Sequence, residues 1–375
     1  MTVCHNFGAG PAVLPLPVLQ RVQNELLDYN GCGCSILELS HRSPQFSSIM
    51  NRAKSSLAAL LKAQHDHGII FLQGGATSQF SAIPLNFAIG KKAHYLVTGI
   101  WSQRAADEAS KLGVEVTITK LTQAFMAEIK NIDFTSYAYI YYCDNETVNG
   151  IEMPVDLIDS LPFKTIPVIC DMSSNILSRE FALEKYALVF AGAQKNIGPA
   201  GLTIVVARNS FIEKNQLDTV IPIMMDYKTY ILNDSLYNTP PTFAIYVSML
   251  VFENLIELGG VIAAQDRNLM KSKLVNDCIE QFPEVYKANV EHKWRSTVNL
   301  TFRIISITNP LQNDQINEKK FVEDAESLGM IQLKGHRSVG GIRVSLYNAI
   351  QHESVLVLVQ YMREFAHNLL KGPTR

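Results

Sequence analysis

Short apolar segments alternate with helical patterns through the first two-thirds of this 375-residue chain. Helices are predicted at 78–88 and 103–112. The predicted strands lie at 68–72, 93–97, 114–119, 138–143, 166–170, 188–191 and 202–207. Strands that alternate with helices favour a mostly parallel sheet covered on both faces. Because such sheets bind ligands outside the carboxyl ends of their strands, the pattern predicts an α/β fold and the edge where its site lies.

The pattern changes after the segment 238–241, which reads Asn-Thr-Pro-Pro. The elements predicted beyond it are helices at 243–258 and 261–281, strands at 297–305 and 341–346, and a helix at 354–370. This order is typical of a smaller α+β unit, and Gly259-Gly260 is the expected break before it. We therefore expect a large domain over 16–260 and a small domain made of 261–375 together with 1–15.

The charge of the chain limits what it can bind. Lysine and arginine number 33 and aspartate and glutamate 35, so the net charge is −2 and no global field recruits polyanions. Hydrophobic residues make up 47% and charged residues 18%, which suits a globular enzyme rather than a nucleic-acid-binding or disordered chain. Any recognition of an anion must therefore come from a local cluster of cations.

The ends and the cysteines give a further set of expectations. The first residues lack a basic segment followed by an apolar one, and no apolar stretch approaches the roughly 18 residues of a membrane span. Cys32-Gly33-Cys34 is the closest cysteine pair, and no second pair completes a zinc spacing. We expect reduced thiols, no metal site, no signal peptide and a cytoplasmic protein.

Lys195 lies in a segment of small residues, AGAQKNIGPAG at 191–201, between two predicted strands. Small residues allow a planar ring to lie against the backbone. A solvated lysine, with a pKa of about 10.4, is a poor nucleophile at neutral pH, but desolvation or linkage to a cofactor changes this. The other interpretation is a surface lysine in a glycine-rich turn.

Asp171 ends the apolar segment PVICD, 24 residues before Lys195. It is either the cap of a following helix or a buried partner for a cation, and Ser173 or Ser174 could do the capping instead. A lysine and a carboxylate at neighbouring strand ends are what pyridoxal phosphate (PLP) requires. The lysine forms a Schiff base, and the carboxylate keeps the ring nitrogen protonated.

Two further positions could contact such a cofactor. The segment 74–78, Gly-Gly-Ala-Thr-Ser, follows a strand and precedes a helix, so its free N–H groups could bind an anion, or it could be an ordinary turn. Trp101, one of two tryptophans, also follows a strand. It could stack on a planar ring or simply belong to the core.

Two basic clusters could hold the anions of a substrate. His41-Arg42 follows the segment 35–39, and KGHRSVGGIR at 334–343 places His336, Arg337 and Arg343 in a glycine-rich stretch. Arginine can grip a carboxylate or a phosphate through two parallel hydrogen bonds. The alternative is that these are solvated loop charges.

Taken together, these segments resemble the phosphoserine aminotransferases, fold-type I PLP enzymes of the class V aminotransferase group. The resemblance runs nearly end to end. The matching segments are FGAGPAVLP near the start, LSHRS at 39–43, QGGATSQF at 73–80, GIWSQRA around Trp101, NETVNG at 145–150, CDMSSNILSR at 170–179, AGAQKNIGPAGLT at 191–203, YNTPPTF at 237–243 and LKGHRSVGGIRVSLYNA at 333–349. It implies a large domain around a mostly parallel seven-stranded sheet and a smaller α+β domain.

The resemblance also implies a role for each matching residue. Lys195 would hold PLP and move the proton between Cα and C4′, while Asp171 would pair with the ring nitrogen. Trp101 would stack on the ring, and Thr147 would hydrogen-bond near it. The cofactor phosphate would be held by Ala76, Thr77 and Gln194, and by Asn238 and Thr239 of the partner subunit in a homodimer. The substrate would be bound by His41, Arg42, His336, Arg337 and Arg343.

Two departures from the family pattern are visible. The segment 74–79 reads GGATSQ where some members have GGGRGQ, so backbone N–H groups must do more of the work of binding the phosphate. Ala9 stands where some members have a serine that touches substrate, so any contact there must come from the backbone.

The implied reaction is a ping-pong transamination. L-Glutamate would leave as 2-oxoglutarate, and 3-phosphohydroxypyruvate would leave as O-phospho-L-serine, for L-serine biosynthesis. Use of 3-hydroxy-2-oxo-4-phosphooxybutanoate in vitamin B6 synthesis stays open. An alanine–glyoxylate type of transaminase would not need the two basic clusters. A cysteine desulfurase would need a cysteine in a late loop, where this chain has none, and a PLP-carrying protein without turnover is the remaining alternative.

Overall fold

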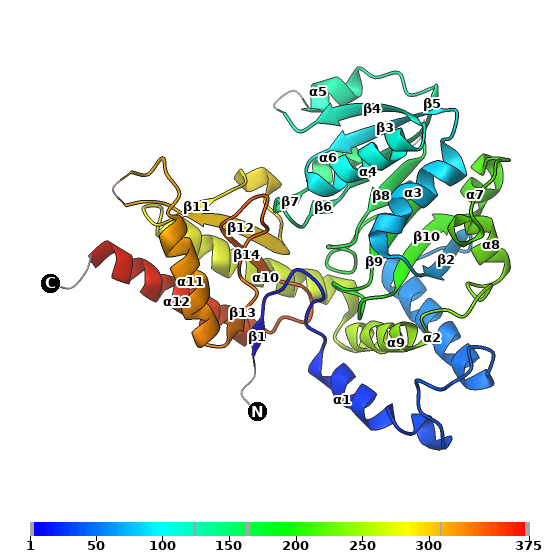
Figure 1. Cartoon of the computed structure of the whole chain (residues 1–375), viewed down its shortest axis with the longest axis horizontal. Helices are drawn as coiled ribbons and strands as arrows, with labels where there is room; N and C mark the ends of the chain where they lie inside the picture. Colours follow the sequence, from blue (N-terminus) through cyan, green and yellow to red (C-terminus); the bar gives the residue numbers. More distant parts are fainter. Residues whose placement is uncertain (1–3, 123–124, 162–165, 308, 372–375) are drawn as a thin grey trace.

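The computed structural model describes residues 4–122, 125–161, 166–307 and 309–371 (Figure 1). Among these residues a seven-stranded sheet has the order β2-β10-β9-β8-β5-β3-β4. Its strands are β2 (His67–Leu72), β3 (Lys92–Val97), β4 (Glu115–Lys120), β5 (Tyr137–Cys143), β8 (Val168–Asp171), β9 (Leu188–Gly192) and β10 (Thr203–Arg208). β10 runs antiparallel to both of its neighbours, and the other pairs are parallel. The predicted mostly parallel seven-stranded sheet is confirmed.

Helices cover both faces of this sheet, which explains why its central strands are almost continuously apolar. On one face α2 (Pro44–Leu61) and α9 (Thr242–Glu257) pack against residues such as Ile140 and Val189. On the other face α3 (Gly75–Phe87) and α4 (Ile100–Lys111) pack against Tyr95 and Phe190 (Figure 1). All five residues of β9 are buried. The chain that leads to Lys195 therefore starts from the centre of the core.

The C-terminal part forms a second, smaller layer with its own core. A three-stranded antiparallel sheet has the order β11-β12-β14, and α10, α11 and α12 pack beside it (Figure 1). The N-terminal segment joins this part, because β1 pairs with β13 and Phe7 is buried in the same core as Phe302. The elements concerned are β1 (His5–Asn6), α10 (Gly260–Gln281), β11 (Tyr286–Ala288), β12 (Asn299–Ile304), α11 (Gln315–Ser327), β13 (Met330–Ile331), β14 (Ile342–Ser345) and α12 (His352–Lys371).

Short elements complete the described chain. The helices are α1 (Leu16–Glu25), α5 (Phe125–Lys130), α6 (Val155–Asp159), α7 (Asn209–Asn215) and α8 (Tyr227–Leu232), and a two-stranded hairpin consists of β6 (Asn145–Glu146) and β7 (Ile151–Glu152). Four 3-10 turns lie at Tyr29–Gly31, Leu183–Lys185, Ile223–Met225 and His292–Trp294.

A sharp turn separates α9 from α10. Gly259 and Gly260 have φ values of 92° and 71°, which glycine adopts without the steric cost that a side chain would add. The two helices are bent by 82° at this point. Together they have the length and hydropathy of a membrane span, whereas no single helix among the described residues has both.

The structure shifts the start of two predicted helices by three residues. α3 begins at Gly75 rather than at 78, and α4 begins at Ile100 rather than at 103. Ala76, Thr77 and Trp101 thus lie in the first turns of helices, where backbone N–H groups have no partner within the helix.

Candidate active site

Four strand ends meet at one edge of the large sheet, as the sequence pattern predicts. Asp171 is the last residue of β8, and Gly192 ends β9 just before Lys195. β3 ends at Val97, shortly before Trp101, and β5 ends at Cys143, shortly before Thr147. The parallel strands between them bring these four side chains to the same end of the fold.

Lys195 points toward the hairpin that follows β5. Its Nζ donates a hydrogen bond to Thr147 Oγ1 at 2.6 Å. Its backbone is held in a tight turn, because the N–H groups of Lys195 and Gly198 both donate to the carbonyl oxygen of Ala193. Burial lowers the pKa of the ammonium group, and the nearby carboxylate of Asp171 opposes that effect. Lys195 is therefore a desolvated lysine beside a carboxylate, and the interpretation as a surface lysine is wrong.

Asp171 is a buried acid rather than the cap of a helix. Its side chain is 4% exposed, and turns rather than a helix follow it. Oδ1 accepts hydrogen bonds from the Ser173 N–H at 2.9 Å and from Ser173 Oγ at 2.6 Å. Burial raises the pKa of the carboxyl, while Ser173 and the charge of Lys195 lower it. Among the described residues no hydrogen-bond partner occupies Oδ2, which leaves it for a ligand.

Trp101 lies in the first turn of α4, beside the hairpin that carries Thr147. Its indole Nε1 is buried and has no hydrogen-bond partner among the described residues. The guanidinium carbon of Arg104 lies 4.9 Å from the centre of its ring. The backbone N–H of Trp101 donates to Glu146 Oε2 at 2.9 Å. Arg104 of the same helix therefore contacts the ring, while the hairpin holds the backbone that carries it.

The start of α3 is built to receive an anion. Gly74 and Gly75 have φ values of 103° and 69°, and a side chain added at Gly75 would meet no atom within 4 Å. No side chain caps this helix, so no capping group satisfies the N–H groups of its first turn, which include those of Ala76 and Thr77. Free N–H groups at the positive end of a helix dipole are an established kind of phosphate site.

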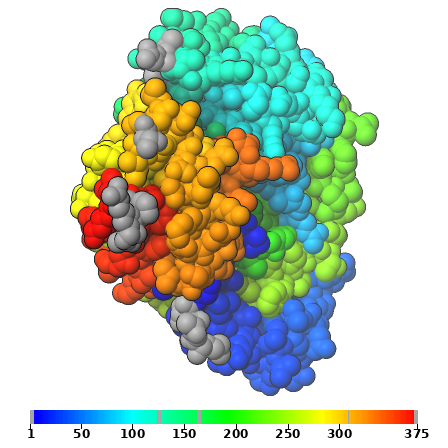
Figure 2. All heavy atoms as spheres, turned by 60° about the vertical axis from the view of Figure 1, so that its left-hand side comes forward, coloured from blue at the N-terminus to red at the C-terminus, as the bar shows by residue number. Residues whose placement is uncertain are grey.

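Arg343 and the 335–341 loop contribute cations to the same site. The charge of Arg343 lowers the pKa of Lys195, and Arg343 Nε is buried without a partner among the described residues. Burial lowers the pKa of His336, and the charges of Arg343, Arg337 and Arg104 lower it further. In Figure 2, orange residues of the C-terminal third face cyan and green residues of the large sheet across a hollow.

The loop that carries His336 and Arg337 rests on an ion pair. Arg303 forms two hydrogen bonds with Glu318, at 2.6 and 3.0 Å, and its Nη1 donates to the Val339 carbonyl at 2.9 Å. A side chain at Gly341 would collide with the Phe302 carbonyl oxygen at 2.5 Å. Only glycine permits this close approach, so the glycines of the motif have a structural cause.

Some predicted residues form no hydrogen bond or ion pair with this group among the described residues. Arg42 and Thr239 are exposed, and His41 and Asn238 are half-buried. Within the described chain no hydrogen bond or ion pair joins these four to Lys195, Asp171 or Arg343. Gln194 lies two residues after the end of β9 and next to Lys195, and its carbonyl oxygen accepts from the Ala12 N–H at 2.9 Å.

Sequence reasoning missed Arg104, Glu146 and Tyr347, and it considered Ser173 only as a possible helix cap. Tyr347 donates to the Ala9 carbonyl at 3.0 Å, so position 9 does contribute through its backbone, and burial raises the pKa of the phenol to about 12. Arg104 had a usable signal, because it lies three residues after Trp101 and therefore on the same face of a helix. The contacts of the other three depend on the tertiary fold.

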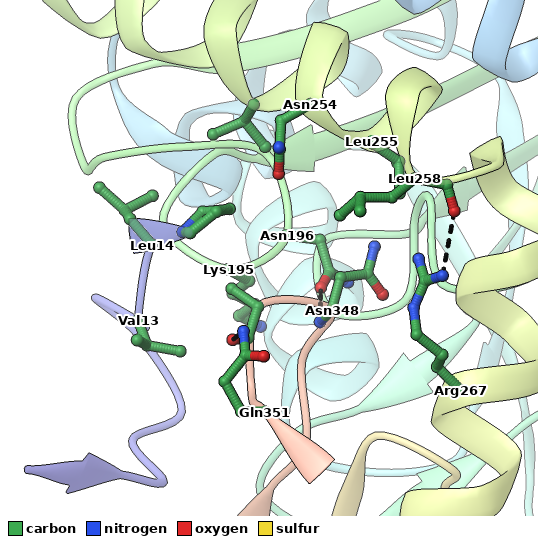
Figure 3. Close-up of a pocket in the computed structure, with 13 residues that line it drawn as sticks. Val13, Leu14, Lys195, Asn196, Asn254, Leu255, Leu258, Arg267, Asn348 and Gln351 are labelled. Carbon is green, nitrogen blue, oxygen red and sulfur yellow. Dashed lines mark hydrogen bonds between the residues drawn. The ribbon is translucent and has the colours of Figure 1, made fainter. Parts of the chain in front are cut away.

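A second crevice adjoins the lysine loop. Figure 3 shows it between the N-terminal segment, α9 and α10, with Arg267 donating to the Leu258 carbonyl at 3.0 Å. Lys195 and Asn196 line one side of it, but neither Asp171 nor Trp101 does. The chemistry therefore belongs to the strand-end edge rather than to this crevice.

The polar groups left open at the edge fit PLP. Lys195 offers an amine, Asp171 offers a buried carboxylate oxygen, and Trp101 offers an aromatic face. The first turn of α3 offers N–H groups to a phosphate. An unpartnered Trp101 Nε1 and an unpartnered Arg343 Nε are the kind of buried donors that a bound ligand satisfies.

Comparison with known proteins gives one consistent result. A family model described as aminotransferase class-V matches residues 4–358. The phosphoserine aminotransferase of Listeria monocytogenes is 45% identical over 99% of this chain and 99% of its own length. The solved phosphoserine aminotransferase of Bacillus circulans subsp. alkalophilus has a TM-score of 0.89 and 40% identity, covering 98% of this chain and 99% of that one. The PLP-bound phosphoserine aminotransferase of Trichomonas vaginalis has a TM-score of 0.86 and 37% identity, covering 96% and 100%.

Proposed function

The chain belongs to the class V aminotransferase family, as a phosphoserine aminotransferase that uses PLP, and from this premise we propose how its own residues carry the reaction. The reaction moves the amino group of L-glutamate to 3-phosphohydroxypyruvate and yields O-phospho-L-serine and 2-oxoglutarate. One observation carries the proposal: the desolvated Lys195 amine lies at a strand-end edge beside the Thr147 hydroxyl and the buried Asp171 carboxylate.

Lys195, Asp171, Trp101, Thr147 and Gln194, with Ala76 and Thr77 at the start of α3, would hold the cofactor. When bound, PLP supplies an electron sink for the electron pair left on the substrate Cα. Asp171 provides the negative charge that keeps a ring nitrogen protonated, and Ser173 keeps its carboxylate oriented. Trp101 supplies a flat apolar surface that excludes water from one side.

Lys195 moves the proton at the substrate Cα. A base needs a pKa near the operating pH, and burial shifts the lysine pKa in that direction. The Thr147 hydroxyl accepts from Nζ at 2.6 Å and so fixes the direction of the amine. The same amine returns the proton when the second substrate receives the amino group.

The basic residues orient two substrates that each carry at least two negative charges. Arg343 would bind the α-carboxylate, because its charge acts on the Lys195 amine and lowers the pKa of that amine. His336 and Arg337 would bind the distal carboxylate or the phosphate, and Arg104 would add its charge to theirs. A local cluster of this kind explains anion recognition by a chain whose net charge is −2.

A homodimer would complete the site. We propose that Asn238 and Thr239 reach the cofactor phosphate across the interface, and that His41 and Arg42 reach the substrate from the partner. The support is that no hydrogen bond or ion pair among the described residues joins them to Lys195, and that apolar neighbours are exposed, Leu37 at 57% and Tyr237 at 46%. We also propose a large domain over 16–260, a small domain of 1–15 and 261–375, and a cytoplasmic location, which six free cysteines support.

A comparison of acceptors tests the assignment. The purified protein, with PLP and L-glutamate, should show a kcat/KM at least about 100-fold higher for 3-phosphohydroxypyruvate than for hydroxypyruvate, because a buried cation left without its phosphate is costly. Equal values would overturn the proposed phosphate grip. Testing 3-hydroxy-2-oxo-4-phosphooxybutanoate in the same assay decides whether the site accepts one more carbon.

A further inference from the structure

The hairpin of β6 and β7 contacts several parts of the active site, because its successive residues bind different partners. Asn145 Nδ2 donates to Ser174 Oγ at 2.7 Å and to Asn299 Oδ1 at 2.8 Å. Glu146 turns to the start of α4, and Thr147 turns to Lys195. The hairpin thus connects the lysine, the helix that carries Trp101, and the smaller sheet.

Glu146 forms the largest number of these hydrogen bonds. Its side chain is fully buried, and its carboxylate accepts the Trp101 N–H at 2.9 Å, the Ser102 N–H at 2.8 Å and Ser102 Oγ at 2.6 Å. Asn149 Oδ1, at the other end of the turn, accepts the Ile100 N–H at 3.1 Å. α4 has no capping side chain of its own at Gly99, so two residues of the hairpin satisfy its first N–H groups.

No cation pairs with Glu146 among the described residues. Burial raises the pKa of this carboxyl, and the three donors from Trp101 and Ser102 lower it. A buried carboxylate without an ion pair is costly, so the hydrogen bonds from Trp101 and Ser102 are what offset its burial. A side chain at Gly99 would collide with the Glu146 carboxyl carbon at 2.6 Å, which shows how closely the hairpin packs on the helix start.

We propose that Glu146 is a positioning residue that holds the Trp101 ring in register with Lys195. The backbone of Trp101 is bound to Glu146, and the next residue along the hairpin, Thr147, is bound to the lysine amine. A shift of α4 along its axis would therefore move the ring away from the position set by Lys195. The inference rests on the proposed function, in which Trp101 covers one face of the cofactor.

The test uses the full-length protein and reads out Trp101 directly. In a Trp294→Phe background Trp101 is the sole tryptophan. Glu146→Gln should raise the Kd of PLP for the apoenzyme about 10-fold and reduce the quenching of Trp101 fluorescence on binding, since an amide nitrogen then faces N–H donors. Ser102→Ala removes one donor but keeps the carboxylate, so it should shift both readouts the same way by less.

A matched control separates positioning from stability. Asp66 caps α7 as Glu146 caps α4, accepting the Ser210 N–H at 3.1 Å and Ser210 Oγ at 2.5 Å, and it precedes β2 at the opposite edge of the sheet. Asp66→Asn should lower Tm and leave the PLP Kd and the Trp101 signal unchanged. A Glu146→Gln protein with unchanged Kd and quenching would overturn the inference, as would equal effects in the Asp66→Asn protein.

One further variant distinguishes the positioning role of Glu146 from the proposed function of Trp101 on which it rests. Trp101→Phe should itself raise the PLP Kd. If it does not, the role of Trp101 and the inference fail together. If Trp101→Phe weakens binding and neither Glu146→Gln nor Ser102→Ala does, the function stands and the positioning role of Glu146 fails.

Discussion

At the scale of single residues, desolvation by the fold decides what a side chain can do. Lys195 and Asp171 are an ordinary lysine and aspartate in sequence, but burial lowers the pKa of the first and raises the pKa of the second. Each shift is limited by the charge of the other residue. The two groups therefore have to be described as a pair.

Replacing Lys195 by alanine should abolish both half-reactions, because no other amine lies beside Thr147 among the described residues. The half-reaction with L-glutamate is followed by the absorbance of bound PLP. Lys195→Arg keeps the charge but not a titratable amine, so it should bind PLP and remain inactive. Turnover in either variant would remove Lys195 from the proton-transfer step.

Replacing Arg337 by alanine should lower kcat/KM for 3-phosphohydroxypyruvate by about 10- to 100-fold, the usual cost of a lost charged hydrogen bond. The PLP Kd should not change, because Arg337 lies in the loop of the smaller part and not at the cofactor phosphate. Steady-state kinetics with phosphorylated and unphosphorylated acceptors measure the effect. An equal loss for both acceptors would contradict a role in binding phosphate.

At the scale of elements, the segment that follows β14 is held by an unusual buried cation. Lys271 on α10 is 2% exposed, and its Nζ donates to the carbonyls of Leu346, Tyr347 and Ile350. Burial lowers the pKa of this amine to about 7, and Arg267 contributes in the same direction. The segment it holds carries Tyr347, which reaches Ala9 and Asn299 in the site.

Lys271 should make stability depend on pH. The pKa of Lys271 is about 7 in the folded protein and about 10.4 in the unfolded chain, so between these pH values the unfolded chain binds one more proton. The free energy of unfolding therefore rises with pH across that window. Urea unfolding at several pH values should show this slope, and Lys271→Met should flatten it while costing about 1–3 kcal/mol for the three buried carbonyls. An unchanged slope would contradict the assignment.

Most elements could be predicted from the sequence, because the alternation of strands and helices reflects burial directly. β9 and β10 were placed within a residue or two, but the starts of α3 and α4 were set three residues late. The reason is physical. Gly75 starts a helix from a left-handed φ, and the first N–H groups of α4 are bound by Glu146, 44 residues away along the chain, so neither helix has a capping side chain at its N-cap residue.

The residues of the candidate site also fall into those that the sequence identifies and those that only the fold reveals. Lys195, Asp171, Trp101 and Arg343 could be identified from motifs in sequence order, and the structure brings them to one edge. Ser173, Glu146 and Tyr347 could not, because each acts through a hydrogen bond that only the folded chain creates. The roles assigned to Asn238, Thr239, His41 and Arg42 stay predictions, since they depend on a second chain.

At the scale of the whole molecule, a mixing experiment tests the shared site. If Arg42 acts across the interface, Arg42→Ala and Lys195→Ala homodimers should both be inactive. Unfolding and refolding them together in equal amounts should restore about a quarter of the wild-type activity, because half the dimers are mixed and each mixed dimer holds one intact site. Size-exclusion chromatography confirms the dimer. No recovery, with mixed dimers demonstrated, would place Arg42 in the site of its own chain.

The antiparallel β10 has one more consequence. In most sheets of this kind the residues after a strand lead into a helix, and they can drift when that helix shifts. Here residues 193–202 lead back into the sheet, because Thr203 of β10 pairs with Gly192 of β9. Lys195 thus lies in a loop whose two ends are both fixed by paired strands of the sheet. Lengthening that loop by even one residue would loosen the position of the Lys195 amine, whereas comparable insertions in the outer loops would leave it in place.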